Sequence, residues 1–114
     1  MSKLQTFRAL AAVVAHDDLE WIQLDVTTAF LNAPLDEEVY MRQPEGFAHD
    51  PSQVFRLLRA LYGLRQAPRA WHQTLRGTLL AHGFTPAESD PSMFILRSSD
   101  EVTLALVYVD DCLI

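Results

Sequence analysis

The chain has 114 residues, of which 49% are hydrophobic and 21% charged, so we expect one packed domain and exclude a disordered chain. A single cysteine, Cys112, excludes an intrachain disulfide, and no apolar stretch is long enough for a membrane helix. The formal net charge is −6, yet residues 51–87 contain five arginines and no acidic residue. A basic middle between acidic flanks fits a surface for phosphates beside one for cations, or simply an exposed arginine-rich helix face.

The first half of the chain predicts a helix and two strands. In residues 2–15, Leu4, Phe7 and Val14 recur at helical spacing, and Ser2 is the expected cap. Residues 21–26 alternate as a strand, with Asp25 at its end on the less apolar face. A helical turn is expected at 27–35, and a second strand at 38–43 before the Pro/Gly break at 44–47.

The second half predicts a strand, a helix and a hairpin. The strand covers 53–61, and the helix begins at Pro68 and runs to Gly83, with Trp71, Leu75 and Leu79 on one stripe. Strands at 92–97 and 102–109 are joined by a short loop, and residues 112–114 begin a partner strand. The fold class is therefore α+β, with helices over a mainly antiparallel sheet.

Two adjacent carboxylates, Asp110 and Asp111, end the apolar strand in "LALVYVDDCLI". Acidic residues are common in hairpin turns, so a solvated turn is one interpretation. The other is a divalent metal site, because carboxylates that converge at a turn can hold such ions. The histidines and the cysteine show no zinc spacing, and the N-terminus has no signal-peptide pattern.

Four ordered blocks carry a resemblance: "IQLDVTTAFLNAPLDEEVYMRQPEGF", "ALYGLRQAPRAW", "GFTPAESDPSMFI" and "LVYVDDCLI". Together they cover nearly the whole chain and resemble the reverse transcriptase of Ty1/copia-type LTR retrotransposons. One departure is Ala33, where the family usually has glycine. The resemblance implies that residues 1–114 are one partial domain: most of a right-hand polymerase palm, with an antiparallel sheet and helices packed on one face, and part of the fingers.

The resemblance also implies roles for individual residues. Asp25, Asp110 and Asp111 match the catalytic aspartates that bind two Mg²⁺ ions, with Mn²⁺ as a possible substitute. Phe30 would be a steric gate against the ribose 2′-hydroxyl, although an aromatic residue seen alone is more often core. The other expected nucleotide contacts are Thr28, Ala29, Gln66 and Val109. The expected contacts to nucleic acid are Tyr108, Arg65 and Arg69, with an exposed helix start as the alternative for the last two.

The implied partners are a template–primer, deoxynucleoside triphosphates and the remainder of a Pol polyprotein, including integrase and RNase H. The family implies a cytoplasmic virus-like particle, and we expect neither secretion nor a membrane. The family's polymerase extends beyond this segment at both ends, so we expect no polymerisation by the segment alone. Two alternatives stay open: an inactive retrotransposon remnant, and a non-enzymatic nucleic-acid-binding module.

Overall fold

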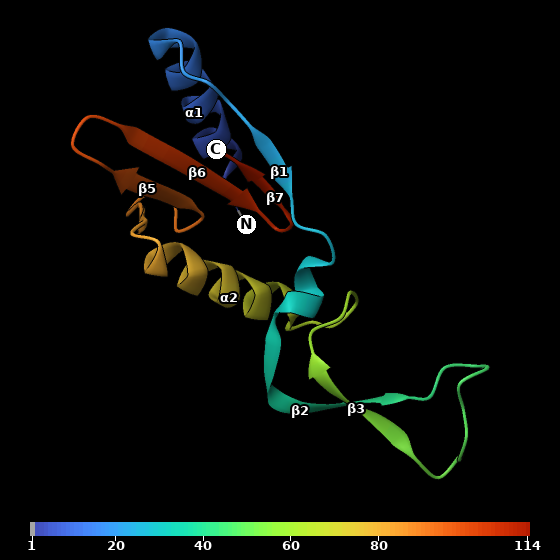
Figure 1. The fold of residues 1–114 in the computed structure, drawn as a ribbon. Coiled ribbons are helices and arrows are strands. Elements are labelled where there is room, and N and C mark those ends of the chain that lie inside the picture. The colour runs from blue at the N-terminus through green and yellow to red at the C-terminus, as the bar shows by residue number, and fades with distance from the viewer. Residues whose placement is uncertain (1) are drawn as a thin grey trace.

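The computed structural model describes residues 2–114 as a five-stranded antiparallel sheet with two long helices and a separate two-stranded hairpin (Figure 1). This confirms the predicted α+β class. The elements are α1 (Leu4–Asp17), β1 (Gln23–Asp25), the short 3₁₀ helix η1 (Ala29–Asn32), β2 (Pro34–Arg42), β3 (Val54–Arg59), α2 (Ala67–Ala81), β4 (Thr85–Pro86), β5 (Met93–Arg97), β6 (Val102–Tyr108) and β7 (Asp111–Leu113).

The five-stranded sheet has the order β1-β7-β6-β5-β4. The predicted hairpin is confirmed as β5 and β6, and the predicted partner strand is β7, which begins at Asp111 and not at Cys112. Strand β1 is one of the two edge strands, and its sheet partner is β7. The first and last strands of the chain are therefore neighbours, and this pairing positions the candidate site.

Helix α2 covers one face of this sheet. Leu75 and Leu79 of α2 pack against the cluster formed by Phe94, Ala105, Val107 and Cys112. The predicted stripe is thus confirmed, and Pro68 lies in the first turn of the helix as expected. The helix ends before Gly83, whose φ of 89° is open to glycine but costly for other residues.

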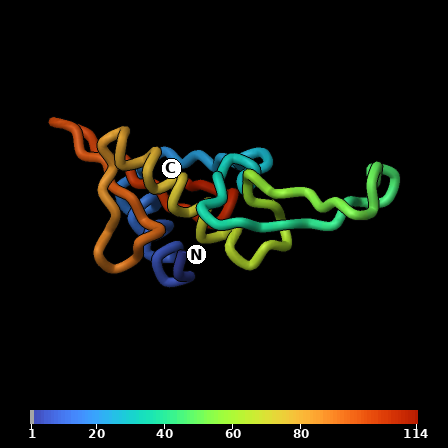
Figure 2. Tube along the Cα trace, turned by 90° about the horizontal axis from the view of Figure 1, so that it is seen from below, coloured from blue at the N-terminus to red at the C-terminus, as the bar shows by residue number. Residues whose placement is uncertain are grey.

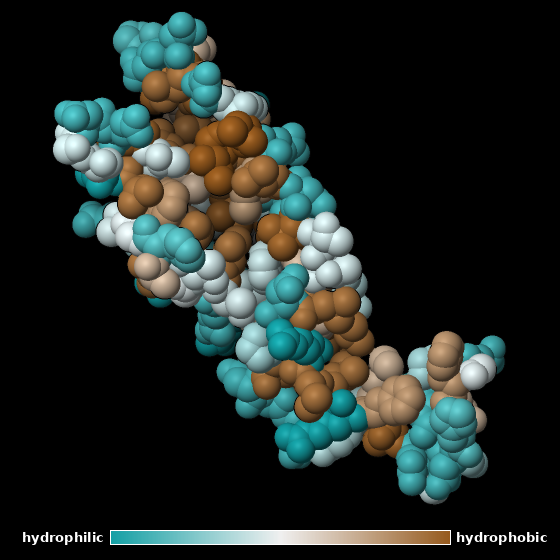
Figure 3. Space-filling view, in the orientation of Figure 1, coloured by the Kyte–Doolittle hydropathy of each residue, from teal (hydrophilic) through white to brown (hydrophobic). Residues whose placement is uncertain are grey.

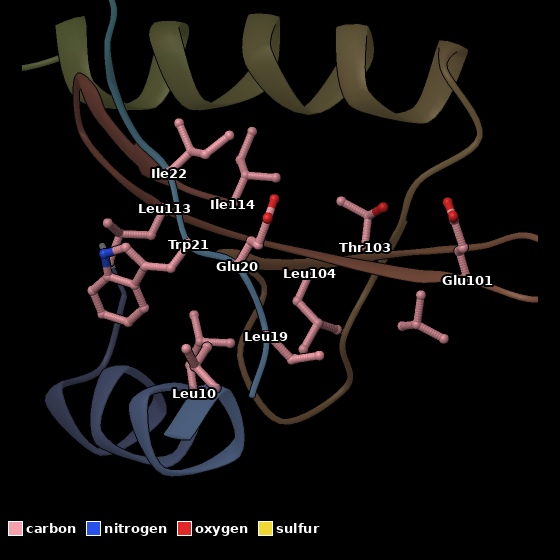
Figure 4. A pocket seen from close by; sticks show the side chains of 12 residues that line it. Leu10, Leu19, Glu20, Trp21, Ile22, Glu101, Thr103, Leu104, Leu113 and Ile114 are labelled. Carbon is pink, nitrogen blue, oxygen red and sulfur yellow. The ribbon is translucent and has the colours of Figure 1, made fainter. Parts of the chain in front are cut away.

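Helix α1 lies on the opposite face, so the expectation that the helices share one face is wrong. Side chains alternate between the faces of a sheet, and Leu104 and Leu113 point away from the α2 side toward Leu10 of α1 (Figure 4). The apolar stripe of a helix shows which side is buried. It does not show which face of the sheet receives it, and both faces here are apolar.

The start of α1 also differs from the prediction. Its N-cap residue is Lys3, not Ser2, and the Lys3 side chain makes no capping hydrogen bond to the first turn of the helix. Instead the buried carboxylate of Asp90 accepts the backbone N–H of Lys3 at 2.9 Å and the hydroxyl of Thr6 at 2.6 Å. A residue far along the chain therefore anchors the helix.

Strands β2 and β3 form a hairpin that projects from the rest of the molecule (Figure 2). With the hairpin included, the molecule measures 60 × 23 × 21 Å. The apolar side chains of the hairpin are largely exposed, with Leu58 at 73% and Phe47, in the connecting loop, at 66%. Further apolar side chains are exposed on and after α1, and Figure 3 shows brown atoms gathering in the half of the molecule that holds the larger sheet. Neither helix in residues 2–114 combines the length and the apolar character of a membrane span.

Candidate functional site

Asp25 and Asp111 face each other across β1 and β7. Ile22 and Ile114 exchange two backbone hydrogen bonds, of 2.7 and 2.8 Å, three residues further along the same ladder. Because hydrogen-bonded and non-bonded pairs alternate in antiparallel strands, the aspartates form a non-bonded pair with Cα atoms about 4.5 Å apart. Their side chains leave the same face of the sheet side by side.

Asp110 comes from the turn that joins β6 to β7, in which Tyr108 pairs with Asp111. Its carbonyl oxygen accepts the backbone N–H of Val26 at 2.8 Å, just beyond the end of β1. Val109, the other residue of the turn, has a φ of 55°. This left-handed conformation costs a β-branched residue on the order of 1–3 kcal/mol, so the surroundings must hold it.

Tyr62, in the loop before α2, links the turn to Phe30. Its hydroxyl donates a hydrogen bond to Asp110 Oδ2 at 3.2 Å, and its ring centroid lies 4.3 Å from that of Phe30. Desolvation raises the pKa of Tyr62, and so do the hydrogen bond and charge of Asp110 and the charge of Asp25. Both carboxylates therefore act on one phenol, as expected if they converge.

Two of the three carboxylates accept hydrogen bonds from neutral side chains. Gln23 Nε2 donates to Asp111 Oδ1 at 3.1 Å, as Tyr62 does to Asp110. None of the three aspartates takes part in an ion pair within residues 2–114. Negative charge is concentrated at one sheet edge without a counter-ion, which favours binding of a cation.

The donor chemistry of this edge suits Mg²⁺, which prefers oxygen ligands and often binds to one or two carboxylates plus substrate phosphates. The backbone pairs Asp25 with Asp111 and holds Asp110 against Val26, just beyond the end of β1. The three aspartate side chains do not form a ready cage: no group of three or more His, Cys, Asp or Glu in the described chain is arranged to hold a metal. Asp110 is turned toward Tyr62 instead.

The residues before β2 lie close to this edge. Phe30 is 6% exposed and belongs to a core cluster against which Val26 and Val109 pack. It is thus a core residue whose ring also contacts Tyr62 beside Asp110. Ala29 is fully buried, whereas Thr28 is exposed and left-handed, with a φ of 52°.

The remaining predicted contacts line two surface pockets or lie in the loop before α2. Gln66 and Arg69 line a 300 Å³ pocket together with acidic residues of β2, and Arg65 is exposed in the loop. Tyr108 and Asp111 line a 710 Å³ pocket between the sheet and the start of α1. A third pocket, of 470 Å³, lies between α1 and the far part of the sheet and contains none of the predicted site residues (Figure 4).

Sequence reasoning missed three residues around the turn: Tyr62, Gln23 and the hydrogen-bonding role of Trp71, whose indole N–H donates to the Val109 carbonyl oxygen. Gln23 had a signal, since it shares the strand face of Asp25. Tyr62 had none, because it lies in a loop without periodicity and contacts a residue 48 positions away.

A family model described as "Reverse transcriptase (RNA-dependent DNA polymerase)" matches residues 1–114. The chain is 51% identical over 94 residues to the retrovirus-related Pol polyprotein from transposon RE1 of Arabidopsis thaliana, which covers 81% of this chain. It is 42% identical over 115 residues to the corresponding polyprotein from transposon TNT 1-94 of Nicotiana tabacum, which covers 98% of it. It is 40% identical over 93 residues to the putative transposon Ty5-1 protein of Saccharomyces cerevisiae, which covers 80% of it.

The matched part is a small share of these relatives: 6% of the RE1 polyprotein, 9% of the TNT 1-94 polyprotein and 30% of the Ty5-1 protein. No solved structure matches the chain significantly.

Proposed function

Because the chain belongs to the reverse transcriptase family of Ty1/copia-type Pol polyproteins, we propose that residues 1–114 carry the nucleotidyl-transfer site of an RNA-directed DNA polymerase. One observation carries this proposal: the register of β1 on β7 puts Asp25 directly opposite Asp111. The turn that holds Asp110 adds a third carboxylate to the same edge. Substrates would be a deoxynucleoside triphosphate and a primer 3′-hydroxyl on an RNA or DNA template.

The three aspartates are the proposed ligands of two Mg²⁺ ions, for which Mn²⁺ could substitute. Such ions, when bound, activate the primer hydroxyl and stabilise the leaving pyrophosphate. The chain contributes three carboxylates that form no ion pair within residues 2–114. The Asp110 carboxylate also accepts a hydrogen bond from Tyr62, which competes with a metal ion for the same oxygen. We therefore expect weak metal binding until substrate phosphates add further oxygen ligands.

Phe30 is the proposed steric gate of the nucleotide pocket. Its ring belongs to a core cluster and also contacts the ring of Tyr62, so it is held in place. A rigid wall at this point would exclude a 2′-hydroxyl. Thr28, Ala29, Val109 and Gln66 are the other proposed nucleotide contacts; Ala29 is fully buried and would have to be uncovered to make one.

Nucleic acid would bind through the basic segment and the sheet edge. Arg65 and Arg69 are exposed and are proposed to contact phosphates, and the half-exposed Tyr108 is proposed to pack near the primer. The larger sheet with α2 would correspond to the palm, and the projecting β2–β3 hairpin to part of the fingers. The remainder of a Pol polyprotein, with integrase and RNase H in a cytoplasmic particle, would complete the assembly.

A Mn²⁺ titration of the ¹⁵N-labelled chain tests the metal site. Paramagnetic broadening should begin at the amides of Asp25, Asp110 and Asp111, because it falls steeply with distance from the ion. Asp110→Asn should weaken it, whereas Asp100→Asn, an exposed carboxylate in the β5–β6 loop, should not. Broadening centred away from the three aspartates, or unchanged in Asp110→Asn, contradicts the proposal.

A primer-extension assay tests the segment alone. We expect no product from residues 1–114 with primer, template, Mg²⁺ and deoxynucleotides, because catalysis here depends on positioning both substrates. The net charge of −6 also weakens retention of an anionic duplex. Template-dependent product that disappears in Asp110→Asn would show that the segment suffices.

A further inference from the structure

The turn that carries Asp110 is held by its two flanking peptide groups. On one side, the carbonyl oxygen of Asp110 accepts the backbone N–H of Val26 from the β1 end at 2.8 Å. On the other side, the carbonyl oxygen of Val109 accepts the indole N–H of Trp71 from α2. Because a peptide group is planar, fixing each carbonyl fixes the dihedral angles on both sides of Asp110.

The Trp71 bond acts at the strained point of the turn. Val109 is β-branched and has a φ of 55°, a conformation that persists only where the surroundings determine it. Trp71 is 5% exposed in the core cluster, and Val109 packs against that cluster. Because the Trp71 N–H is buried, water cannot replace the Val109 carbonyl oxygen as its acceptor. The hydrogen bond therefore stabilises one orientation of the Val109 carbonyl group.

We propose that Trp71 is a positioning residue for the candidate metal site: its indole N–H fixes the Val109–Asp110 peptide and thereby the direction in which the Asp110 carboxylate leaves the turn. The part of this inference that concerns the metal rests on the proposed function, whereas the part that concerns the backbone does not. Trp71 touches neither substrate nor metal and acts through the peptide group alone.

The alternative is that Trp71 only fills the core. Trp71→Phe separates the two roles, because phenylalanine keeps an aromatic ring in the cluster but has no N–H. The matched control is Trp21→Phe, which makes the same change at a tryptophan that is 41% exposed and packs edge-on against Phe7.

Backbone hydrogen exchange, followed by NMR on residues 1–114 without truncation, provides a readout that is independent of activity. The Val26 N–H is bonded to Asp110 and reports the turn, and the Ile22 N–H is bonded to Ile114 at the other end of the same ladder. In Trp71→Phe we expect the Val26 N–H to exchange about tenfold faster and the Ile22 N–H to keep its rate. The same variant should bind Mn²⁺ about three- to tenfold more weakly, the effect of losing roughly one hydrogen bond.

Equal acceleration of both amides would assign Trp71 a general stabilising role and overturn the proposal, as would no change in either. Selective acceleration in a chain that binds no Mn²⁺ at the aspartates would support the backbone role while the proposed function fails. If Trp71→Phe does not fold, hydrogen exchange in the unsubstituted chain still tests the proposal. The Trp71 indole N–H should then exchange as slowly as the Val26 N–H, and a rate equal to that of the Trp21 indole overturns the proposal.

Discussion

Asp90→Ala should release the start of α1 from the β4–β5 loop, because one carboxylate holds three separate donors. Asp90 Oδ2 accepts the Lys3 N–H and the Thr6 hydroxyl, and Oδ1 accepts the buried Ser92 N–H at 2.9 Å. At about 1 kcal/mol for each hydrogen bond, the loss in unfolding free energy should be about 3 kcal/mol. Asp90 itself is 1% exposed, so water cannot readily replace the lost acceptor.

Urea unfolding followed by circular dichroism measures this loss. With a slope of about 2 kcal/mol/M, the midpoint should fall by about 1.5 M. Tryptophan fluorescence adds local information, since the Trp21 ring lies 6.0 Å from Phe7 of α1. Asp100→Ala, an exposed carboxylate in the β5–β6 loop, is the control and should leave the midpoint unchanged. A loss below about 0.5 kcal/mol for Asp90→Ala, a value typical of surface substitutions, would refute the anchoring role.

Three further outcomes are expected. Burial acts to raise the pKa of Asp90, but its hydrogen bonds and the Lys3 charge lower that pKa below the ordinary value. The contribution of Asp90 to the free energy of unfolding should therefore be fully present above about pH 4 and be lost as the pH drops through the folded-state pKa. A urea midpoint in Asp90→Asn that depends on pH just as the parent's does would contradict this. In an intact polyprotein, Phe30→Ala should raise kcat/KM for a ribonucleotide relative to its deoxy counterpart, and an unchanged ratio would leave Phe30 with a core role only. Tyr62→Phe should free Asp110 and strengthen Mn²⁺ binding a few-fold in a calorimetric titration, whereas Tyr40→Phe, which removes a similar exposed tyrosine–carboxylate bond of 3.1 Å, should not.

Local patterns predicted most of the elements. The Trp71–Leu75–Leu79 stripe predicted α2 and its buried side, and two apolar runs separated by a short polar loop predicted β5 and β6, with the turn after β6 at the aspartate pair. The three aspartates could be placed at strand ends, because Asp25 ends one strand and Asp110 and Asp111 follow another. These features depend on neighbours within a few residues, which a sequence displays directly.

Features that depend on distant contacts were not predictable in this way. The anchor of α1 is Asp90, 87 positions from Lys3, and no local spacing connects the two. The same holds for Tyr62 and Asp110. The placement of α1 on the opposite face from α2 is likewise a tertiary choice, because either face of the sheet could receive an apolar helix.

The pairing of β1 with β7 has a consequence for how the chain folds during synthesis. Strand β1 is made well before its sheet partner β7, because 88 positions separate Gln23 from the Asp111 carboxylate that it contacts. At 5–20 residues per second, the ribosome needs roughly 4 to 18 seconds to cover that interval. During this time β1 is an unpaired strand with exposed apolar groups, open to association with other chains. The pairing that places Asp25 opposite Asp111 thus also covers one hydrogen-bonding edge of β1.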